Sequence, residues 1–275
     1  MSPEDAVQSY DVFRERILAH YRAHGRHDLP WRLTRDPYAV LVSEVMLQQT
    51  GVTRVCPHFI EWLGDFPDSE ALAAAPLEVV LRAWQGLGYN RRAVALQRTA
   101  TVIVSEYGGI VPADREALLA LPGIGPATAA GVRAFAFGLP DVYLETNVRA
   151  VFLHEFFADA TDVPDSAIRP LVEATVDHDD PRTWYWALLD YGSHLKRTLP
   201  NPSRRSRHHT RQSRFEGSHR QLRARALRMV LDAPGSGPGD LADLLGVEGA
   251  CVTRALEELV SEGFLAEENG RYRVR

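Results

Sequence analysis

A short turn rich in proline and glycine interrupts two helical patterns near the middle of the chain and limits what the chain can fold into. It lies within LALPGIGPATAAGV, residues 119–132, where Pro122 precedes Gly123 and Pro126 follows Gly125. Glycine adopts backbone dihedrals that are closed to other residues, and proline is favoured at the first position of a helix. The pattern predicts two helices joined by a tight, stiff turn. Its amides can bind a phosphate at the start of the second helix, although an ordinary glycine-capped helical hairpin fits the same letters.

Most of the remaining chain also has helical periodicity, with Gly or Pro between successive segments. Asp36 is a suitable N-cap for the segment that begins at Pro37. The main body is therefore expected to be all-α. The expected helices span residues 5–24, 37–50, 53–63, 68–74, 77–85, 90–107, 113–120, 126–137, 146–158, 165–177 and 181–196.

The C-terminal part predicts a small separate unit. A helix over 219–233 is followed by two helices that meet at Gly246 and by a two-stranded hairpin around residues 268–270. This order is typical of a winged helix-turn-helix. A helical tail used for packing or dimerisation is the alternative, and the arginine-rich first helix favours DNA contact.

Charge and cysteine content narrow the class of protein. Residues 196–228 carry eleven Lys or Arg and one acid, a local charge of +10, which leaves −15 for the rest of a chain whose total is −5. The pI of about 6.1 is an average over an acidic main part and this basic segment. The basic segment is suited to bind the phosphates of a nucleic acid. Only two cysteines, Cys56 and Cys251, are present, which excludes a disulfide framework. We expect no metal site, no membrane segment and a cytoplasmic, nucleoid-associated location.

Three segments carry a family resemblance. LPGIGPATA resembles the hairpin of the helix-hairpin-helix DNA glycosylases, the endonuclease III superfamily. Residues 29–55, LPWRLTRDPYAVLVSEVMLQQTGVTRV, and residues 84–93, WQGLGYNRRA, resemble two signatures of its adenine DNA glycosylase branch. The resemblance covers about residues 8–195. It implies a two-lobed helix-hairpin-helix glycosylase domain over 1–195. The composition and pattern of the rest predict an arginine-rich linker over 196–218, where relatives have an iron–sulfur loop, and a winged helix-turn-helix over 219–275.

The resemblance also assigns residues that contact DNA. Duplex DNA with a damaged or mispaired base is the expected partner of a monomeric enzyme, and a monovalent cation often accompanies the hairpin in this family. Gln48 and Tyr89 are candidates for wedge and stacking roles once the base is flipped out. Trp31 and Arg32 are candidates for the base pocket, with core packing the alternative for Trp31 and Tyr89. The hairpin residues that are candidates for backbone contact are Gly123, Gly125, Pro126 and Thr128. The charge of the basic segment, and not the resemblance, adds Arg204, Arg205, Arg207, Arg211 and Arg214 as candidates.

Glu44 is the candidate general acid. It is the only charged residue between Tyr38 and Arg54, on an otherwise apolar helix. Burial disfavours the charged form, and a carboxylic acid that stays protonated can protonate a leaving base. A solvated, outward-pointing Glu is the ordinary alternative. The resemblance aligns Glu44 with the catalytic acid of the family.

Glu145 is the candidate partner carboxylate. The family has Asp at the aligned position, where it stabilises positive charge on the sugar, and Asn147 aligns with an asparagine that positions it. Glutamate is one methylene longer, so this chain departs from the pattern. An acid at a helix N-terminus, favoured by the helix dipole, is the competing explanation for Glu145.

Two further departures concern lyase activity and the cofactor. Bifunctional relatives carry a lysine where this chain has Ala127, and Lys196 is the only lysine present, so lyase activity is expected to be weak or absent. The adenine branch often has Ser or Tyr at that same position. No four-cysteine iron–sulfur cluster can form, so no cofactor is expected.

These features predict a monofunctional DNA glycosylase of base excision repair, adenine-type, that leaves an abasic site. Such enzymes normally add a nudix-like domain that senses the lesion, which the C-terminal unit replaces here. The alternatives are a glycosylase for mismatched thymine or uracil, or for a modified pyrimidine such as 5-hydroxymethylpyrimidine. A non-catalytic DNA-binding regulator is the alternative from another class.

Overall fold

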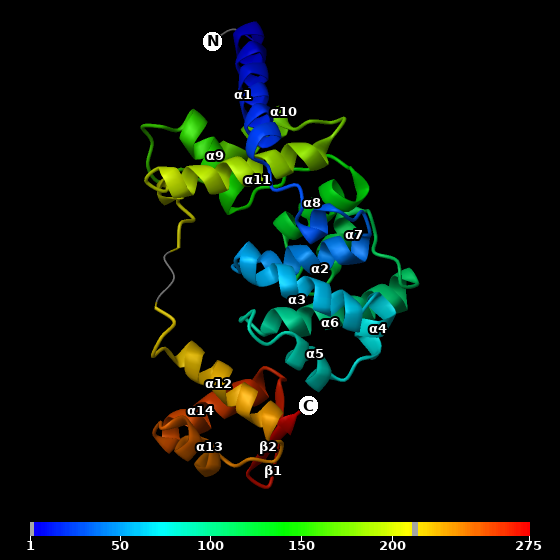
Figure 1. The fold of residues 1–275 in the computed structure, drawn as a ribbon, viewed down its shortest axis with the longest axis vertical. Helices are drawn as coiled ribbons and strands as arrows, with labels where there is room; N and C mark the ends of the chain where they lie inside the picture. Colours follow the sequence, from blue (N-terminus) through cyan, green and yellow to red (C-terminus); the bar gives the residue numbers. More distant parts are fainter. Residues whose placement is uncertain (1–2, 211–213) are drawn as a thin grey trace.

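The computed structural model describes residues 3–210 and 214–275, and this part of the chain is helical apart from one C-terminal hairpin (Figure 1). Arg211, a candidate DNA contact, lies outside the described residues. None of the described helices is long and apolar enough to cross a membrane. In chain order the elements are α1 (Pro3–His24), η1 (Pro30–Arg32), α2 (Pro37–Leu47), α3 (Val52–Asp65), α4 (Ser69–Ala74), α5 (Leu77–Ala83), α6 (Arg91–Tyr107), α7 (Arg115–Ala120), α8 (Pro126–Phe137), α9 (Thr146–Phe156), α10 (Asp165–Thr175), α11 (Pro181–Thr198), η2 (Pro202–Arg205), α12 (His219–Asp232), α13 (Pro238–Leu245), α14 (Gly249–Ser261), β1 (Leu265–Glu268) and β2 (Arg271–Val274).

Local chemistry explains where the helices begin and end. The Asp36 side chain accepts hydrogen bonds from the amides of Tyr38 and Ala39, so it caps α2 as expected. The helix stops at Leu47 rather than near residue 50, because Gln49 adopts a left-handed backbone with φ of 58°. In the turn before α8, only Gly123 uses such a conformation, with φ of 76°, whereas Gly125 is extended. Both glycines were expected to need unusual dihedrals, and only the first does.

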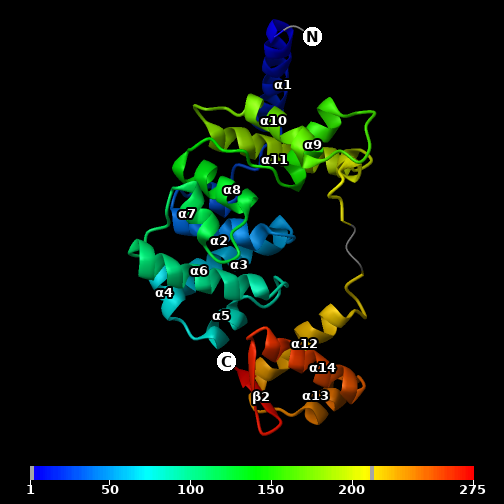
Figure 2. The ribbon, with the colours of Figure 1, turned by 180° about the vertical axis from the view of Figure 1, so that it is seen from behind.

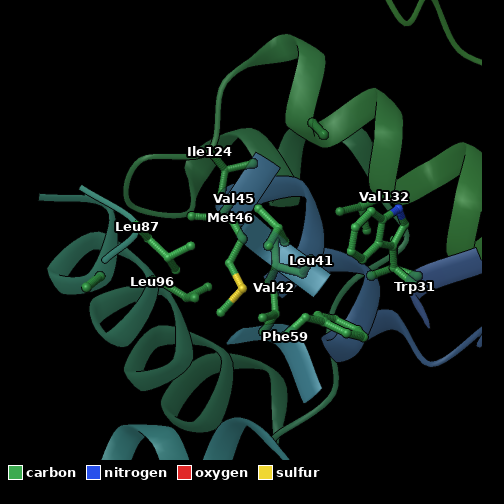
Figure 3. Close-up of a cluster of buried hydrophobic side chains, with 14 of the residues drawn as sticks. Trp31, Leu41, Val42, Val45, Met46, Phe59, Leu87, Leu96, Ile124 and Val132 are labelled. Carbon is green, nitrogen blue, oxygen red and sulfur yellow. The ribbon is translucent and has the colours of Figure 1, made fainter. Parts of the chain in front are cut away.

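The glycosylase-like part consists of two lobes (Figures 1 and 2). Helices α1, α9, α10 and α11 form one lobe, and α2 to α8 form the other. Helix α11 crosses α9 so closely that a Cβ on Gly192 would lie 2.2 Å from the Asn147 carbonyl oxygen. In the second lobe, buried residues of α2 pack between α8 and α6; Figure 3 shows Met46 facing Leu96.

Arg92, at the start of α6, joins two turns that lie beside each other. Its guanidinium donates to the carbonyls of Val45, Met46 and Gln48 at 2.7–2.9 Å. A positive charge therefore lies at the C-terminus of α2, where the helix dipole favours it. The other end of the group donates to the carbonyls of Leu87 and Gly88 at 3.2 and 2.9 Å. The turns over residues 47–50 and 86–90 are therefore fixed relative to each other by one side chain.

The first residues of the basic segment, 196–228, pack against the first lobe and do not form a linker. Helix α11 extends to Thr198, and η2 then packs against α9, with Ser203 and Ser206 buried. Ser206 forms a parallel bridge with Val163, and Arg205 donates to the Leu153 carbonyl at 3.2 Å. The beginning of the expected linker thus belongs to the packed structure of the first lobe.

The C-terminal unit has the order of elements predicted from the sequence. Helices α12, α13 and α14 pack together, and β1 pairs with β2 in an antiparallel hairpin. The unit contacts the second lobe through ion pairs: Arg82 binds Asp232, and Arg91 donates to Glu262 at 2.9 Å. Figures 1 and 2 show it beside α5 and α6, at the opposite end of the molecule from α1.

Replacing Arg92 with lysine should destabilise the protein. Lysine keeps the charge but cannot bond both turns in the fork geometry of a guanidinium, so several buried carbonyls lose their donor. We expect Arg92→Lys to lower the free energy of unfolding by about 2–3 kcal/mol in urea denaturation. The matched control is Arg98→Lys, at an exposed position of the same helix. An equal effect of both substitutions would contradict the role given to Arg92.

Candidate functional site

Glu44 lies on α2 with its carboxyl turned toward α8 and the segment before α9. A Cβ on Gly131 of α8 would lie 2.3 Å from Glu44 Oε2, so the absence of a side chain there gives the carboxyl its space. Tyr143 donates a hydrogen bond from its hydroxyl to the same oxygen at 3.2 Å. Burial is the largest influence and raises the pKa of Glu44 to about 8, while the Tyr143 bond lowers it and the Glu145 charge raises it.

Glu145 is the N-cap of α9. Its Oε1 accepts the amides of Asn147 and Val148, and its Oε2 accepts the Asn147 side-chain amide at 3.2 Å. Burial raises the pKa of this carboxyl, and the backbone amides together with the charges of Lys196 and Arg149 act in the opposite direction. From the sequence, an acid at a helix N-terminus is the competing explanation for Glu145. The position of Glu145 at the start of α9 agrees with that explanation.

The two carboxyls share one environment but differ in their partners. The charge of each carboxyl raises the pKa of Tyr143, and the charge of Glu145 raises the pKa of Glu44. Glu145 accepts three N–H groups, which favour an ionised carboxylate, whereas Glu44 accepts one hydroxyl. Burial raises the pKa of both carboxyls, and Glu145 alone has several N–H donors that favour its charged form.

Gln48 and Tyr89 lie on the two turns that Arg92 joins. The Gln48 amide donates to the Thr128 hydroxyl of α8 at 3.1 Å, so the end of α2 is tied to the helix after the hairpin. Tyr89 is 42% exposed and has a left-handed φ of 50°, with the Arg92 guanidinium over its ring. An exposed aromatic held on a rigid turn is suited to stack on a base.

Trp31 and Arg32 lie in the interior. Trp31 is 7% exposed and packs edge-on against Phe59. Arg32 is also buried, and it donates to Asp190 of α11 at 2.8 and 3.0 Å. Trp31 thus connects η1 to α3 of the second lobe, and Arg32 connects it to α11 of the first. Trp31 lies in the core, which is the alternative that the sequence left open for it.

The hairpin presents unused amides beside Gln48. Within the described ranges, neither the Gly123 nor the Gly125 N–H has a hydrogen-bond acceptor, and Gly125 faces open space. A hollow lined by Gln48, Arg91, Gly123 and their neighbours lies at this point. The hairpin, the end of α2 and the start of α6 therefore meet on one surface.

The arginines of the basic segment divide into two groups. Arg205 and Arg207 contact the protein, through the Leu153 carbonyl and Asp162 respectively. Arg204 and Arg214 are exposed. Many members of the family that the sequence resembles bind an iron–sulfur cluster after the last domain helix, but the residues at the end of α11 do not fit one. Cys56 lies in α3 and Cys251 in α14, so no thiolate set exists there, and η2 fills that place by packing on α9.

Sequence reasoning missed Tyr143 and Arg92. Tyr143 is buried and contacts Glu44 across 99 residues of chain, which no local pattern could indicate. Arg92 belongs to the WQGLGYNRRA segment, so the motif includes it. The motif alone could not predict that its side chain binds backbone carbonyls. Among the described residues, no group of three or more His, Cys, Asp or Glu could hold a metal ion.

Comparison with known proteins identifies the family. Residues 42–177 match the family described as HhH-GPD superfamily base excision DNA repair protein. The adenine DNA glycosylase of Mycolicibacterium smegmatis is 34% identical over 270 residues, which covers 90% of this chain and 92% of that protein. The chain belongs to the helix-hairpin-helix DNA glycosylase superfamily. Within it, the M. smegmatis similarity places the chain on the adenine glycosylase branch.

Two further comparisons show how much of the chain is similar to known glycosylases. The adenine DNA glycosylase of Buchnera aphidicola subsp. Baizongia pistaciae is 33% identical over 186 residues, 66% of this chain. The chain spans only 52% of that glycosylase, about half its length. A solved thermostable thymine-DNA glycosylase superposes with a TM-score of 0.61 at 28% identity, over 68% of this chain and 88% of the other. The glycosylase fold predicted from the sequence is therefore confirmed.

The pH dependence of stability should reveal the proton on Glu44. Because folding raises this pKa from 4.5 to about 8, the folded protein binds an extra proton over that range. Stability is highest below pH 4.5 on this account and is lost as pH rises through 8, by up to about 1.4 kcal/mol per pH unit. Glutamine cannot titrate.

We therefore expect Glu44→Gln to remove that slope in urea unfolding measured at pH 5, 6, 7 and 8. Glu61→Gln, at an exposed position of α3, is the control and should parallel the wild type. If Glu44→Gln also paralleled the wild type, Glu44 would not carry the extra proton.

Proposed function

We propose that the chain is a monofunctional DNA glycosylase that excises a mispaired adenine from duplex DNA and leaves an abasic site. The observation that carries the proposal is the pair of unlike carboxyls, Glu44 with its pKa raised to about 8 and Glu145 bound by three N–H groups. The similarity to proteins named adenine DNA glycosylase supports the choice of base.

The chemistry follows from the two environments. Glu44, still protonated at neutral pH, gives its proton to a ring nitrogen of the flipped base as the bond from the base to the sugar breaks. The bonding electrons leave with the base, and positive charge develops on the sugar. The Glu145 carboxylate stabilises this charge, a water oxygen then bonds to the sugar carbon, and its proton passes to a carboxylate.

Contacts on one surface support DNA as the partner. The free amides of Gly123 and Gly125, with the N-terminus of α8, suit a backbone phosphate. Gln48 and Tyr89 lie on the adjoining fixed turns, where they can enter the gap left by a flipped nucleotide. The exposed Arg204 and Arg214 extend the positive surface along the basic segment.

The remaining assignments concern the domain division, lyase activity and cofactor. We infer a glycosylase domain over 1–195, a basic connection over 196–218 and a winged helix-turn-helix over 219–275. Ala127 supplies no amine beside the sugar, and Lys196 is the chain's only lysine, which supports hydrolysis without strand cleavage. The missing cysteine set supports an enzyme that needs no iron–sulfur cluster.

A second candidate is a glycosylase for thymine or uracil paired with guanine. The superposition on a thymine-DNA glycosylase favours it, as does Glu145 in place of the aspartate implied by the resemblance. A site with a longer carboxylate can hold its sugar and base differently, and small displacements of reacting groups change rates strongly.

Excision assays decide between these candidates. Duplexes with A opposite 8-oxoguanine, T or U opposite G, and 5-hydroxymethylpyrimidine should be compared, and we expect A opposite 8-oxoguanine to be cut fastest. Glu44→Gln should lower that rate by about 10²-fold or more, since it removes the proton donor. The wild-type rate should fall as pH rises past about 8, where Glu44 loses its proton.

Each other outcome has a defined meaning. Faster excision of T or U would favour the second candidate. Binding to these duplexes without any excision would favour a regulator and reject the enzyme. Glu61→Gln, on the surface of α3, controls for nonspecific effects of a lost carboxylate.

The basic segment should set the salt dependence of DNA binding. Each phosphate contact contributes about 0.9 to the slope of log affinity against log salt, so Arg204→Gln with Arg214→Gln should reduce the slope by about 1–2. Arg22→Gln with Arg169→Gln, exposed on α1 and α10, is the control pair. An unchanged slope in the first pair would mean that these arginines do not contact phosphate.

A further inference from the structure

We propose that Tyr143 is a positioning residue for the general acid, and that its hydroxyl together with the bare backbone of Gly131 fixes which oxygen of Glu44 carries the proton toward the substrate. This inference deepens the proposed function and rests on it.

The first step concerns Oε2 of Glu44, which is enclosed. Tyr143 donates to it at 3.2 Å, and a Cβ on Gly131 would lie 2.3 Å away from it. The same Cβ would lie 3.0 Å from Cε2 of the Tyr143 ring, so the ring, the carboxyl and the α8 backbone meet at one point. No water or base can enter between them at these distances.

The second step concerns the state of the tyrosine. Burial raises the pKa of Tyr143 well above its usual value, and the charges of Glu44 and Glu145 raise it further. The phenol therefore stays protonated and serves as a donor to Oε2 at neutral pH. A neutral carboxyl whose Oε2 accepts this bond carries its own proton on Oε1.

The third step concerns Oε1. In the part of the chain that the structure describes, this oxygen has no hydrogen-bond partner and is not fully buried. Glu44 keeps part of its surface accessible. The proton-bearing oxygen is thus the one left free to face a bound base.

The tyrosine is itself held firmly. Its backbone amide donates to the Tyr185 hydroxyl at 3.2 Å, and its ring packs edge-on against Tyr185 and Phe135 at centroid distances of 5.3 Å. A side chain with these contacts cannot turn away from Glu44 without disturbing α8 and α11. The acid is therefore oriented by packing as well as by one hydrogen bond.

The test compares Tyr143→Phe with Tyr38→Phe, which removes another buried hydroxyl from α2 itself. For Tyr143→Phe we expect kcat for base excision to fall about tenfold to a hundredfold with DNA affinity unchanged. The alkaline limb of the pH profile should move to higher pH, because the lost hydrogen bond had lowered the pKa of Glu44. Tyr38→Phe should leave that limb in place.

Direct titration of Glu44 by carboxyl carbon NMR separates the two proposals. A Glu44 pKa and a pH profile equal to those of the wild type in Tyr143→Phe would overturn the positioning role even if the wild type excises bases. No excision by the wild type would reject the proposed function, and with it the positioning role that rests on it.

Gly131→Ala provides a second variant if Tyr143→Phe does not fold. Its Cβ must displace the Glu44 carboxyl, so kcat should fall while DNA affinity is retained. Wild-type kcat in Gly131→Ala would overturn the proposal.

Discussion

The hydrogen bonds of the Arg92 guanidinium are the interaction on which the arrangement of the site depends. One planar cation binds the carbonyls that end α2 and the carbonyls of the glycine turn before α6. Gln48 and Tyr89 sit on these two turns, and Glu44 lies one helical turn before Gln48. Gln48, Tyr89 and Glu44 therefore lie on segments that Arg92 holds together. Burial lowers the pKa of Arg92 to about 10, still high enough to keep it charged at neutral pH.

The lobes contribute different kinds of chemistry to the centre. The α2–α8 lobe buries Glu44 and leaves it the Tyr143 hydroxyl as its one hydrogen-bond donor, which favours the protonated carboxyl. The other lobe provides the first turn of α9, whose amides donate to Glu145 and oppose the rise that burial causes in its pKa. Helix α11 supports that turn through the close contact at Gly192. Two acids of the same residue type thus have different hydrogen-bond partners in the buried centre of the molecule.

The sequence predicted those features that depend on neighbouring residues. Helix starts at Pro37 and Pro126 follow from local caps, and the C-terminal order of helices and hairpin follows from periodicity and the turn at Gly246. Side-chain partners from distant segments could not be predicted, because periodicity carries no information about them. The Tyr143 bond to Glu44 is of this kind, as is the interior position of Arg32, whose partner lies 158 residues further along the chain. Family resemblance identified Glu44 and Glu145 but could not indicate what surrounds them.

The side chain that caps the start of α9 is also the carboxylate to which the proposed function gives a catalytic role. Any shift that let Glu145 follow the sugar closely would leave the amides of Asn147 and Val148 unbonded, and the helix would fray. If Glu145 acts on the sugar as proposed, it does so from this fixed place, and the nucleotide has to move to it.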